Sequence, residues 1–349
     1  MHRESWWNPE KHADRSASLK ARGRIRKALR QHLEDAGFAE VEAAILQRSP
    51  GNEAHLHAFA TAFVPAGGEA TRLYLHTSPE YACKKLLAAG ETRIFEFARV
   101  FLNRERGDLH APEFTMLEWY RAAEQYRVVM DDCLTLLKLA GRAVPSPVLR
   151  FRNRTCDPFR EAEKLTVAEA FERFAGIDLL ASLNAQGEGD RDVLAAIARR
   201  KGIEPGEDDS WSDLFSKILV AKIEPQLGIG CPALLYEYPR CEAALARATA
   251  HDGRVAERFE LYACGVELAN GFGELTDPIE QRRRFEAEME EKARLYGERY
   301  PLDEDFLAAL SSMPEASGVA LGFDRLVMLA LGAPRIDDVI WTPLPDDIR

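Results

Sequence analysis

The sequence predicts an α+β protein whose antiparallel strands are flanked by helices. Two β-rich stretches, 94–101 and 115–120, enclose a polar loop, and a third, 258–272, is divided by a polar turn at 263–265. Each arrangement is typical of a hairpin, and helical patterns precede, separate and follow these stretches. With 349 residues and 46% hydrophobic content the chain can bury a large core, so one large domain with insertions is the simplest organisation.

A helix over 18–36 opens the pattern. Ser16 or Ser18 is expected to cap it and Gly37 to end it. Four apolar residues fall near one face: Leu19, Ile25, Leu29 and Leu33. An amphipathic helix followed by a strand is common and needs no special function. This segment alone does not show whether it has a functional role or only a structural one.

The remaining elements follow from similar patterns. Extended segments are expected at 38–41 and 73–76, and helices at 80–90, 128–139, 278–300 and 326–331. Glu80 stands in the first turn of its helix, where a carboxylate suits the helix dipole. The stretch from about 147 to 231 is predicted to be an insertion of helices, with its clearest pieces at 167–174, 192–201 and 211–223. The predicted organisation is a single domain, 1–349, that contains this insertion.

Composition limits the function classes. Acidic residues outnumber lysine and arginine by 57 to 46, giving a formal net charge of −11, which disfavours general binding to a phosphate backbone. The six cysteines include no CxxC pair, as expected of reduced thiols. Residues 1–17 lack the apolar core of a signal peptide, and the apolar stretch 318–332 is interrupted by Asp324 and Arg325. We therefore expect a cytoplasmic protein without a membrane span.

Three segments mix charged residues into apolar, strand-like sequence, where an unpaired buried charge would be costly. They are FEFARVFLNRERGDLHAPEFTMLEWYR at 95–121, ELYACGVELANGFGELTD at 260–277 and GVALGFDR at 318–325. In this order they resemble motif 2, motif 3 and the segment between them in class II aminoacyl-tRNA synthetases of the lysyl type. The resemblance runs from about Ser18 to Pro343 and implies the class II catalytic fold, an antiparallel sheet of about six strands flanked by helices.

The 18–42 segment resembles motif 1, the dimer-interface element of that family, so the resemblance implies a homodimer. Ala44 stands where the family usually has proline. No anticodon-binding domain is recognised before the catalytic pattern, which makes tRNA an unlikely partner.

Glu260 and Glu267 lie on the two arms of a predicted hairpin, where their carboxylates could face each other across Mg²⁺. The plainer alternative is two surface glutamates. The resemblance implies that both hold the Mg²⁺ that accompanies ATP. It also implies that Arg325 lies over the adenine and reaches the phosphates, that Phe114 stacks on the other face of the adenine, and that His110 reaches the outer phosphates. Core packing for Phe114 and an ordinary loop histidine are the alternatives.

Acidic residues in the same segments suggest the substrate. A basic amino acid with two ammonium groups requires at least two buried anions. The resemblance implies that Glu274 and Tyr120 take the side-chain ammonium, Glu80 and Glu118 the other amino group, and Asn270 the carboxylate, with Phe272 beside them.

Several details resemble a short paralogue family, the elongation factor P lysine ligases. These are TMLEWYR at 115–121, ELANGF at 267–272, GVALG at 318–322, and Ala320 in place of a glycine. The added methyl group would reshape the space around the amino end of the substrate, in keeping with (R)-β-lysine as the substrate of that family. A single methyl group changes the discrimination between substrates by only about 1–3 kcal/mol. The resemblance implies that the amino acid, lysine or β-lysine, is activated with ATP and transferred to a lysine of elongation factor P. That reaction requires no enzyme nucleophile.

The motif 2 segment departs from the family. Leu102 replaces an arginine that holds the α-phosphate, and Arg104 stands at the place of a glutamate. Because residues 102 and 104 of a strand share a face, our hypothesis is that Arg104 supplies the missing guanidinium and Glu105 replaces the glutamate. Asp108 adds a negative charge near the expected triphosphate. Further departures are Ala111 and Gly273.

Two alternative functions follow. One is a class II synthetase paralogue that charges tRNA or another carrier. The other is a catalytically silent regulator that binds ATP or an amino acid, for which Leu102 and Asp108 are the support.

Overall fold

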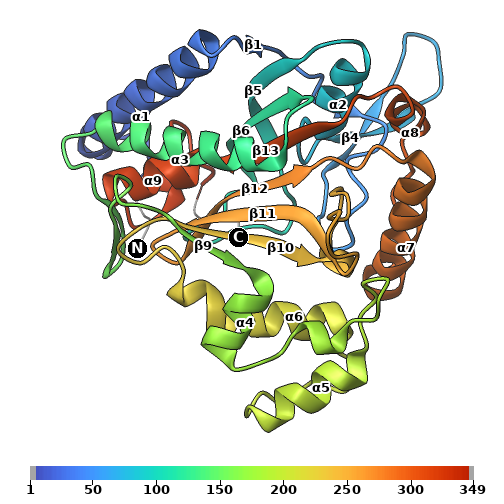
Figure 1. Ribbon diagram of the computed structural model, residues 1–349. Helices are drawn as coiled ribbons and strands as arrows, with labels where there is room; N and C mark the ends of the chain where they lie inside the picture. The colour runs from blue at the N-terminus through green and yellow to red at the C-terminus, as the bar shows by residue number, and fades with distance from the viewer. Residues whose placement is uncertain (1–4, 346–349) are drawn as a thin grey trace.

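The computed structural model describes residues 5–345, and an eight-stranded mixed sheet forms its centre (Figure 1). In spatial order the strands are β1 (Ala39–Glu40), β5 (Arg93–Phe101), β6 (Glu113–Ala122), β13 (Ala316–Gly322), β12 (Val266–Gly273), β11 (Val255–Ala263), β10 (Ala233–Pro239) and β9 (Glu163–Thr166). Neighbours are antiparallel except at the two edges, where β1 pairs with β5 and β9 with β10 in parallel.

The α+β class and the antiparallel sheet are confirmed, but the sheet has eight strands and not six. The six central strands, from β5 to β10, form the antiparallel part. The two parallel edge strands, β1 and β9, have only two and four residues. Strand β1 lies within the extended segment predicted at 38–41, whereas β9 carries too little hydrophobic periodicity to be recognised in a sequence.

Three helices cover one face of the sheet, α1 (Pro9–Asp35), α3 (Tyr126–Arg142) and α9 (Phe323–Leu331) (Figure 1). Their apolar faces share one buried cluster with side chains of the central strands, among them Leu117, Trp119 and Val319. Burial of such side chains is the main favourable term in folding. This core holds β6, β12 and β13 in fixed register, which matters because their other faces carry the polar residues.

Helix α1 starts nine residues earlier than predicted. Asn8 caps it, its Oδ1 accepting a hydrogen bond of 2.9 Å from the N–H of Glu10, and Pro9 occupies the first position, where a missing N–H costs nothing. Ser16 and Ser18 therefore lie inside the helix and are not its caps. The end is as predicted, because Gly37 follows with φ +82°.

A second group of helices lies beside the sheet, α2 (Glu80–Ala88), α7 (Pro278–Tyr296) and α8 (Glu304–Leu310) (Figure 1). Tyr81 of α2 stacks on Phe306 of α8 with ring centroids 4.2 Å apart. A small sheet of β2 (Leu46–Gln47), β4 (Thr71–Leu75) and β3 (Ala60–Phe63) precedes α2 in the chain. None of the helices within residues 5–345 is long and apolar enough to cross a bilayer.

The predicted insertion contains the expected helices, α4 (Val167–Ala175), α5 (Arg191–Arg200) and α6 (Trp211–Ile218). It opens with strands that were not expected, the β7 (Leu149–Phe151) and β8 (Arg154–Cys156) hairpin and then β9. Short 3₁₀ or π segments complete the chain at Leu180–Ser182, Leu219–Ile223, Glu224–Gln226, Arg240–Glu242 and Ile336–Asp338. The insertion buries its own apolar cluster against Leu235 and Tyr238 of β10.

Candidate active site

The residues proposed from the sequence gather around one cavity of about 330 Å³. Strands β6, β12 and β13 line it together with the β5–β6 loop, the loop after β2 and the start of α2. The predicted residues that line it are Glu80, Glu105, His110, Phe114, Glu118, Tyr120, Glu267, Asn270, Phe272, Glu274, Ala320 and Arg325. Of the predicted set, only Glu260 and Arg104 do not.

Strand register explains this convergence. Side chains alternate between the two faces of a strand, so Leu117 and Trp119 enter the core whereas Glu118 and Tyr120 face the cavity. Across four strands, one row consists of Glu118, Ala320, Asn270 and Glu260, and the next of Tyr120, Gly318, Phe272 and Arg258. Glu118 and Ala320, 202 positions apart in the sequence, are therefore direct neighbours in the sheet.

Gly318 makes room for two of these side chains. A Cβ at this position would overlap the ring of Tyr120 and lie 2.6 Å from Oε1 of Glu274. The absence of a side chain thus allows the tyrosine and the glutamate to lie flat against β13.

One end of the cavity is strongly acidic. Glu118 is buried and accepts hydrogen bonds from the Ser78 hydroxyl at 2.5 Å and the Tyr120 hydroxyl at 2.8 Å. Glu80 and Glu274 both pair with the ammonium group of Lys84, at 2.5 and 2.6 Å. Burial, and then the nearby Glu80, raise the pKa of Glu118 to about 8. A pocket with this surplus of carboxylates suits a ligand that carries positive charge.

Arg325 dominates the other end. Its guanidinium donates to the carbonyl oxygens of Leu109 at 3.2 Å and Glu267 at 3.1 Å, and to Nε2 of His110 at 2.7 Å. Since arginine only donates, His110 accepts at Nε2 and carries its proton on Nδ1. Burial, and then Arg325, lower the pKa of His110, so the imidazole is neutral and its Nδ1–H remains a donor. Phe114 is half-buried and lines the cavity instead of packing in the core.

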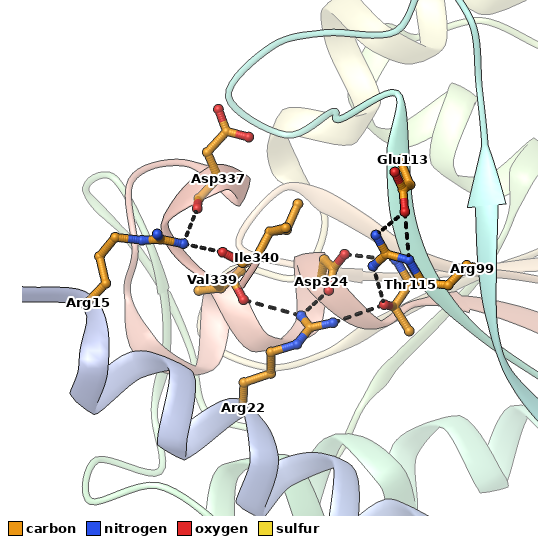
Figure 2. Close-up of polar contacts among 9 residues, drawn as sticks. All are labelled: Arg15, Arg22, Arg99, Glu113, Thr115, Asp324, Asp337, Val339 and Ile340. Carbon is orange, nitrogen blue, oxygen red and sulfur yellow. Dashed lines mark hydrogen bonds and ion pairs between the residues drawn. The ribbon is translucent and has the colours of Figure 1, made fainter. Parts of the chain in front are cut away.

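A buried polar network fixes the start of α9, the helix that carries Arg325 (Figure 2). Asp324 accepts a hydrogen bond of 2.8 Å from the N–H of Thr115 in β6 and forms an ion pair with Arg22 of α1. Arg22 also donates to the Thr115 hydroxyl at 2.9 Å. Asp324 is fully buried and Arg22 nearly so. Helix α1 is thus connected to the strand that carries Phe114 and to the helix that carries Arg325.

The predicted metal pair lies on one face of the β11–β12 hairpin. Glu260 is opposite Asn270, and Glu267 is opposite Tyr262, two residues further along β11. Glu260 accepts hydrogen bonds from Arg258 at 2.8 Å and Tyr262 at 2.5 Å. Burial, and then Glu260, raise the pKa of Glu267. No group of three or more potential ligand side chains is positioned to hold a metal among residues 5–345.

The hypothesis for Arg104 is wrong in its geometry. Strand β5 ends at Phe101, and Arg104 lies in a turn with φ +67°, so it does not share a strand face with Leu102. Its guanidinium contacts Glu298, just after α7, at 2.5 Å and lies over the ring of Tyr296. Leu102 itself lines the cavity, as does Glu105, whose carboxylate is 3.8 Å from Nε2 of His110.

Sequence reasoning missed several residues of the site. Arg258 donates to Oδ1 of Asn270 at 3.2 Å, so the amide nitrogen of Asn270 points away from Arg258. Glu224, from the insertion, lies 3.4 Å from the Tyr262 hydroxyl, and burial followed by Glu260 raises its pKa to about 7. Lys84 could have been noticed as the i+4 partner of Glu80, but that spacing is common on helix surfaces.

Comparison with known proteins agrees with this geometry. The family described as tRNA synthetases class II (D, K and N) matches residues 5–345. The chain belongs to this family. Within the class II family it is similar to proteins named "Elongation factor P--(R)-beta-lysine ligase". The relative from Proteus mirabilis (strain HI4320) is 40% identical over 335 residues, which cover 94% of this chain and 95% of the relative.

Two further relatives with the same printed name match to the same extent. The protein of Erwinia tasmaniensis is 42% identical over 331 residues, covering 93% of this chain and 94% of the relative. That of Actinobacillus succinogenes is 38% identical over 345 residues, covering 97% and 98%. The class II resemblance inferred from the three motif segments, and the closer resemblance to the elongation factor P lysine ligases, are therefore both confirmed.

Proposed function

We propose that this protein activates a lysine-type amino acid, (R)-β-lysine in particular, with ATP and transfers it to the ε-amino group of a lysine of elongation factor P. The observation that carries the proposal is one cavity with carboxylates at one end and Arg325, His110 and Phe114 at the other. It occurs in a chain whose relatives, matched over nearly their whole length, bear that activity in their names.

The reaction has two steps, and neither of them requires a covalent enzyme intermediate. A carboxylate oxygen of the amino acid attacks the α-phosphorus of ATP, and pyrophosphate leaves. The acceptor amine then attacks the carbonyl carbon of the adenylate, AMP leaves, and the amine gives up a proton as the amide forms. Electrostatic stabilisation and positioning can supply most of the catalysis in such a transfer.

The nucleotide end suits ATP. Arg325 is held by two backbone carbonyls and His110, so its charge is positioned before the ligand arrives. The Nδ1–H of His110 is free to donate to a phosphate oxygen, and Phe114 offers an aromatic face. Glu267, with Glu260 beside it, would hold Mg²⁺, an ion that uses one or two protein carboxylates and takes its other ligands from phosphates and water. Bound Mg²⁺ would neutralise charge on the leaving pyrophosphate.

The acidic end suits an amino acid with two ammonium groups. Glu118 and Glu80 would bind one of them and Glu274 the other, with the Asn270 amide nitrogen donating to the carboxylate. Ala320 lies between Glu118 and Asn270 in the sheet, so its methyl group limits the space between these two contacts. This position makes it the residue we expect to select the isomer.

One observation favours a second candidate, a silent regulator that binds ATP or an amino acid. Leu102 places an apolar side chain in the cavity where a cation is expected. Arg104 does not supply that cation, because its guanidinium contacts Glu298. The charging of tRNA or another carrier is the remaining alternative.

Amino-acid-dependent ATP–pyrophosphate exchange separates these functions. We expect exchange with (R)-β-lysine to exceed that with α-lysine, and arginine to be inactive. The product is then identified by incubating the enzyme, ATP and β-lysine with elongation factor P and measuring the mass of the modified lysine peptide. Folded protein that binds ATP without any exchange would establish the regulator instead, and preferred exchange with α-lysine together with tRNA acylation would establish the charging enzyme.

We also propose that the chain acts as a single catalytic domain, in the cytoplasm and as a homodimer. The helical insertion supports the first point because its core shares Leu235 and Tyr238 with the central sheet.

A further inference from the structure

Lys84 occupies an unusual position behind the acidic end of the cavity. It lies in α2 one turn after Glu80, its side chain is 1% exposed, and it does not line the cavity. Its Nζ contacts Oε1 of Glu80 at 2.5 Å and Oε2 of Glu274 at 2.6 Å. These two carboxylates come from segments that are far apart in the sequence, and the proposed function gives them to different ammonium groups of the substrate.

A surface ion pair does not explain this arrangement. An exposed Glu–Lys pair at i,i+4 contributes little to stability, whereas burying a lysine without compensation is strongly unfavourable. Burial alone would lower the pKa of Lys84, but Glu274 and then Glu80 raise it above its ordinary value. The lysine is therefore charged, and two carboxylates share its charge.

The other acidic groups nearby have different partners. Glu118 accepts hydrogen bonds from the neutral hydroxyls of Ser78 and Tyr120. Glu53 lines the cavity, and Glu96, directly opposite Glu118 on β5, accepts a hydrogen bond of 3.1 Å from the N–H of Ala43. Burial is the largest cause that raises the pKa of both Glu53 and Glu96, to about 7. Glu80 and Glu274 differ from these three in sharing one fixed cation.

Removal of that cation would leave the buried Glu274 close to the partly buried Glu80 with no cation between them. Like charges at close range in a poorly solvated site cannot both ionise easily, so the buried Glu274 would take up a proton more readily. A protonated carboxyl no longer neutralises an ammonium group. Glu274 would be affected most, since burial already favours its neutral form and Lys84 is the largest influence that opposes it.

We propose that Lys84 is a positioning residue that determines specificity: its fixed ammonium group orients Glu80 and Glu274 and opposes protonation of Glu274, so that both carboxylates suit an amino acid with two ammonium groups. This inference rests on the proposed function. When Glu80, Glu118 and Glu274 are all ionised, the charge of Lys84 leaves a surplus of two negative charges, which a doubly charged amino acid neutralises.

The test uses two variants of the full chain. Lys84→Ala removes the equivalent of propylammonium, and Lys84→Met removes the charge while keeping most of the packing. For both we expect the KM for β-lysine in pyrophosphate exchange to rise by about tenfold or more, with the KM for ATP changed by less than about twofold. Added n-propylammonium should restore the KM of Lys84→Ala, whereas 1-propanol should not. Neither should restore Lys84→Met, because methionine fills the space.

A second readout needs no turnover. A proton on Glu274 binds to the folded state more tightly than to the unfolded chain, so stability falls as pH rises. We expect the Tm of Lys84→Met, relative to the wild type, to decrease between pH 6 and pH 8. A wild-type KM in Lys84→Met, or a Tm difference that is the same at both pH values, would overturn the inference and assign Lys84 to packing. Absence of exchange in the wild type contradicts the proposed function instead, and the Tm comparison still decides on Lys84.

Discussion

Leu102 is the residue that we expect to limit activity most directly. It lines the cavity on the loop that also carries His110, and Arg104 is held 2.5 Å from Glu298. We expect Leu102→Arg to increase the rate of pyrophosphate exchange by about 100- to 1000-fold, because a positioned donor at a developing charge contributes about 2.7–4 kcal/mol. Arg104→Ala should change the rate by less than about twofold. A large loss in Arg104→Ala would show that the arginine moves into the cavity when ATP binds.

Glu118 should make substrate binding depend on pH. In the empty pocket its pKa is about 8, chiefly because of burial, so it is mostly protonated at pH 6. An ammonium group binds the ionised form, and the KM for the amino acid should therefore fall by nearly tenfold per pH unit from pH 6 toward 8 and then level off. The rates are measured at saturating ATP across this range.

The same titration of Glu118 should lower the stability of the folded protein as pH rises. A carboxyl group whose folded pKa is raised destabilises the fold progressively as pH rises from the unfolded value toward about 8. Glu118→Gln removes this titration, so its Tm relative to the wild type should increase from pH 6 to pH 8, and its KM should lose most of the pH dependence. A wild-type KM that does not change between pH 6 and 8 contradicts the assignment.

At the scale of elements, the structure joins helix α1 to the end of the cavity that contains Arg325. Arg22 reaches Asp324 and Thr115, and Arg15 donates to backbone carbonyls of Asp337 and Ile340 near the C-terminus (Figure 2). A buried ion pair contributes little net stability, but loss of one partner leaves an uncompensated charge that costs about 3–5 kcal/mol.

We therefore expect Arg22→Met to lower the Tm by about 5–10 °C and to raise the KM for ATP more than that for the amino acid, because Asp324 precedes Arg325. The double variant Arg22→Met/Asp324→Asn should be less destabilised than the two single variants combined. Lys27→Met, an exposed position on the same helix, is the control and should leave both quantities unchanged. Additive losses in the double variant would show that the pair is not coupled.

At the scale of the molecule, sequence predicted the site better than the loops around it. The alternation in 115–121 predicts which side chains share a strand face, but the row of Glu118, Ala320 and Asn270 follows from the strand register of the assembled sheet. The side chain of Arg104 could not be placed in this way. Its conformation depends on Glu298, 194 positions away, and no periodicity in the sequence reports such a contact.

The same limit explains why the sequence did not predict the burial of Lys84 or the number of strands in the sheet. A Glu–Lys pair at i,i+4 is identical in sequence whether it is exposed or buried, and only the contact with Glu274 reveals its burial. The edge strands β1 and β9 form because β5 and β10 offer unpaired edges, which are a property of the assembled sheet.

The quaternary structure is the remaining prediction at this scale. The 18–42 segment resembles the dimer element of class II synthetases, and the structure places Arg26 there within a group of arginines. Its Nε is buried without a hydrogen-bond partner, and burial followed by Arg30 and Arg22 lowers its pKa. An acidic group of a second copy would neutralise this cluster. We expect light scattering at micromolar concentration to give about twice the chain mass of 39.2 kDa.

Charge reversal at this position tests where the copies meet. Arg26→Glu should shift the protein toward the monomer, because a carboxylate there would repel the acidic group that we expect from the partner. Lys222→Glu, at an exposed position of the insertion, makes the same change of net charge and should leave the mass unchanged. A wild type that stays monomeric at micromolar concentration excludes the dimer, and an Arg26→Glu variant that remains dimeric places the interface away from this face of α1. Because α1 also holds Asp324 through Arg22, a shift to monomer that raises the KM for ATP would show that assembly and nucleotide binding depend on the same helix.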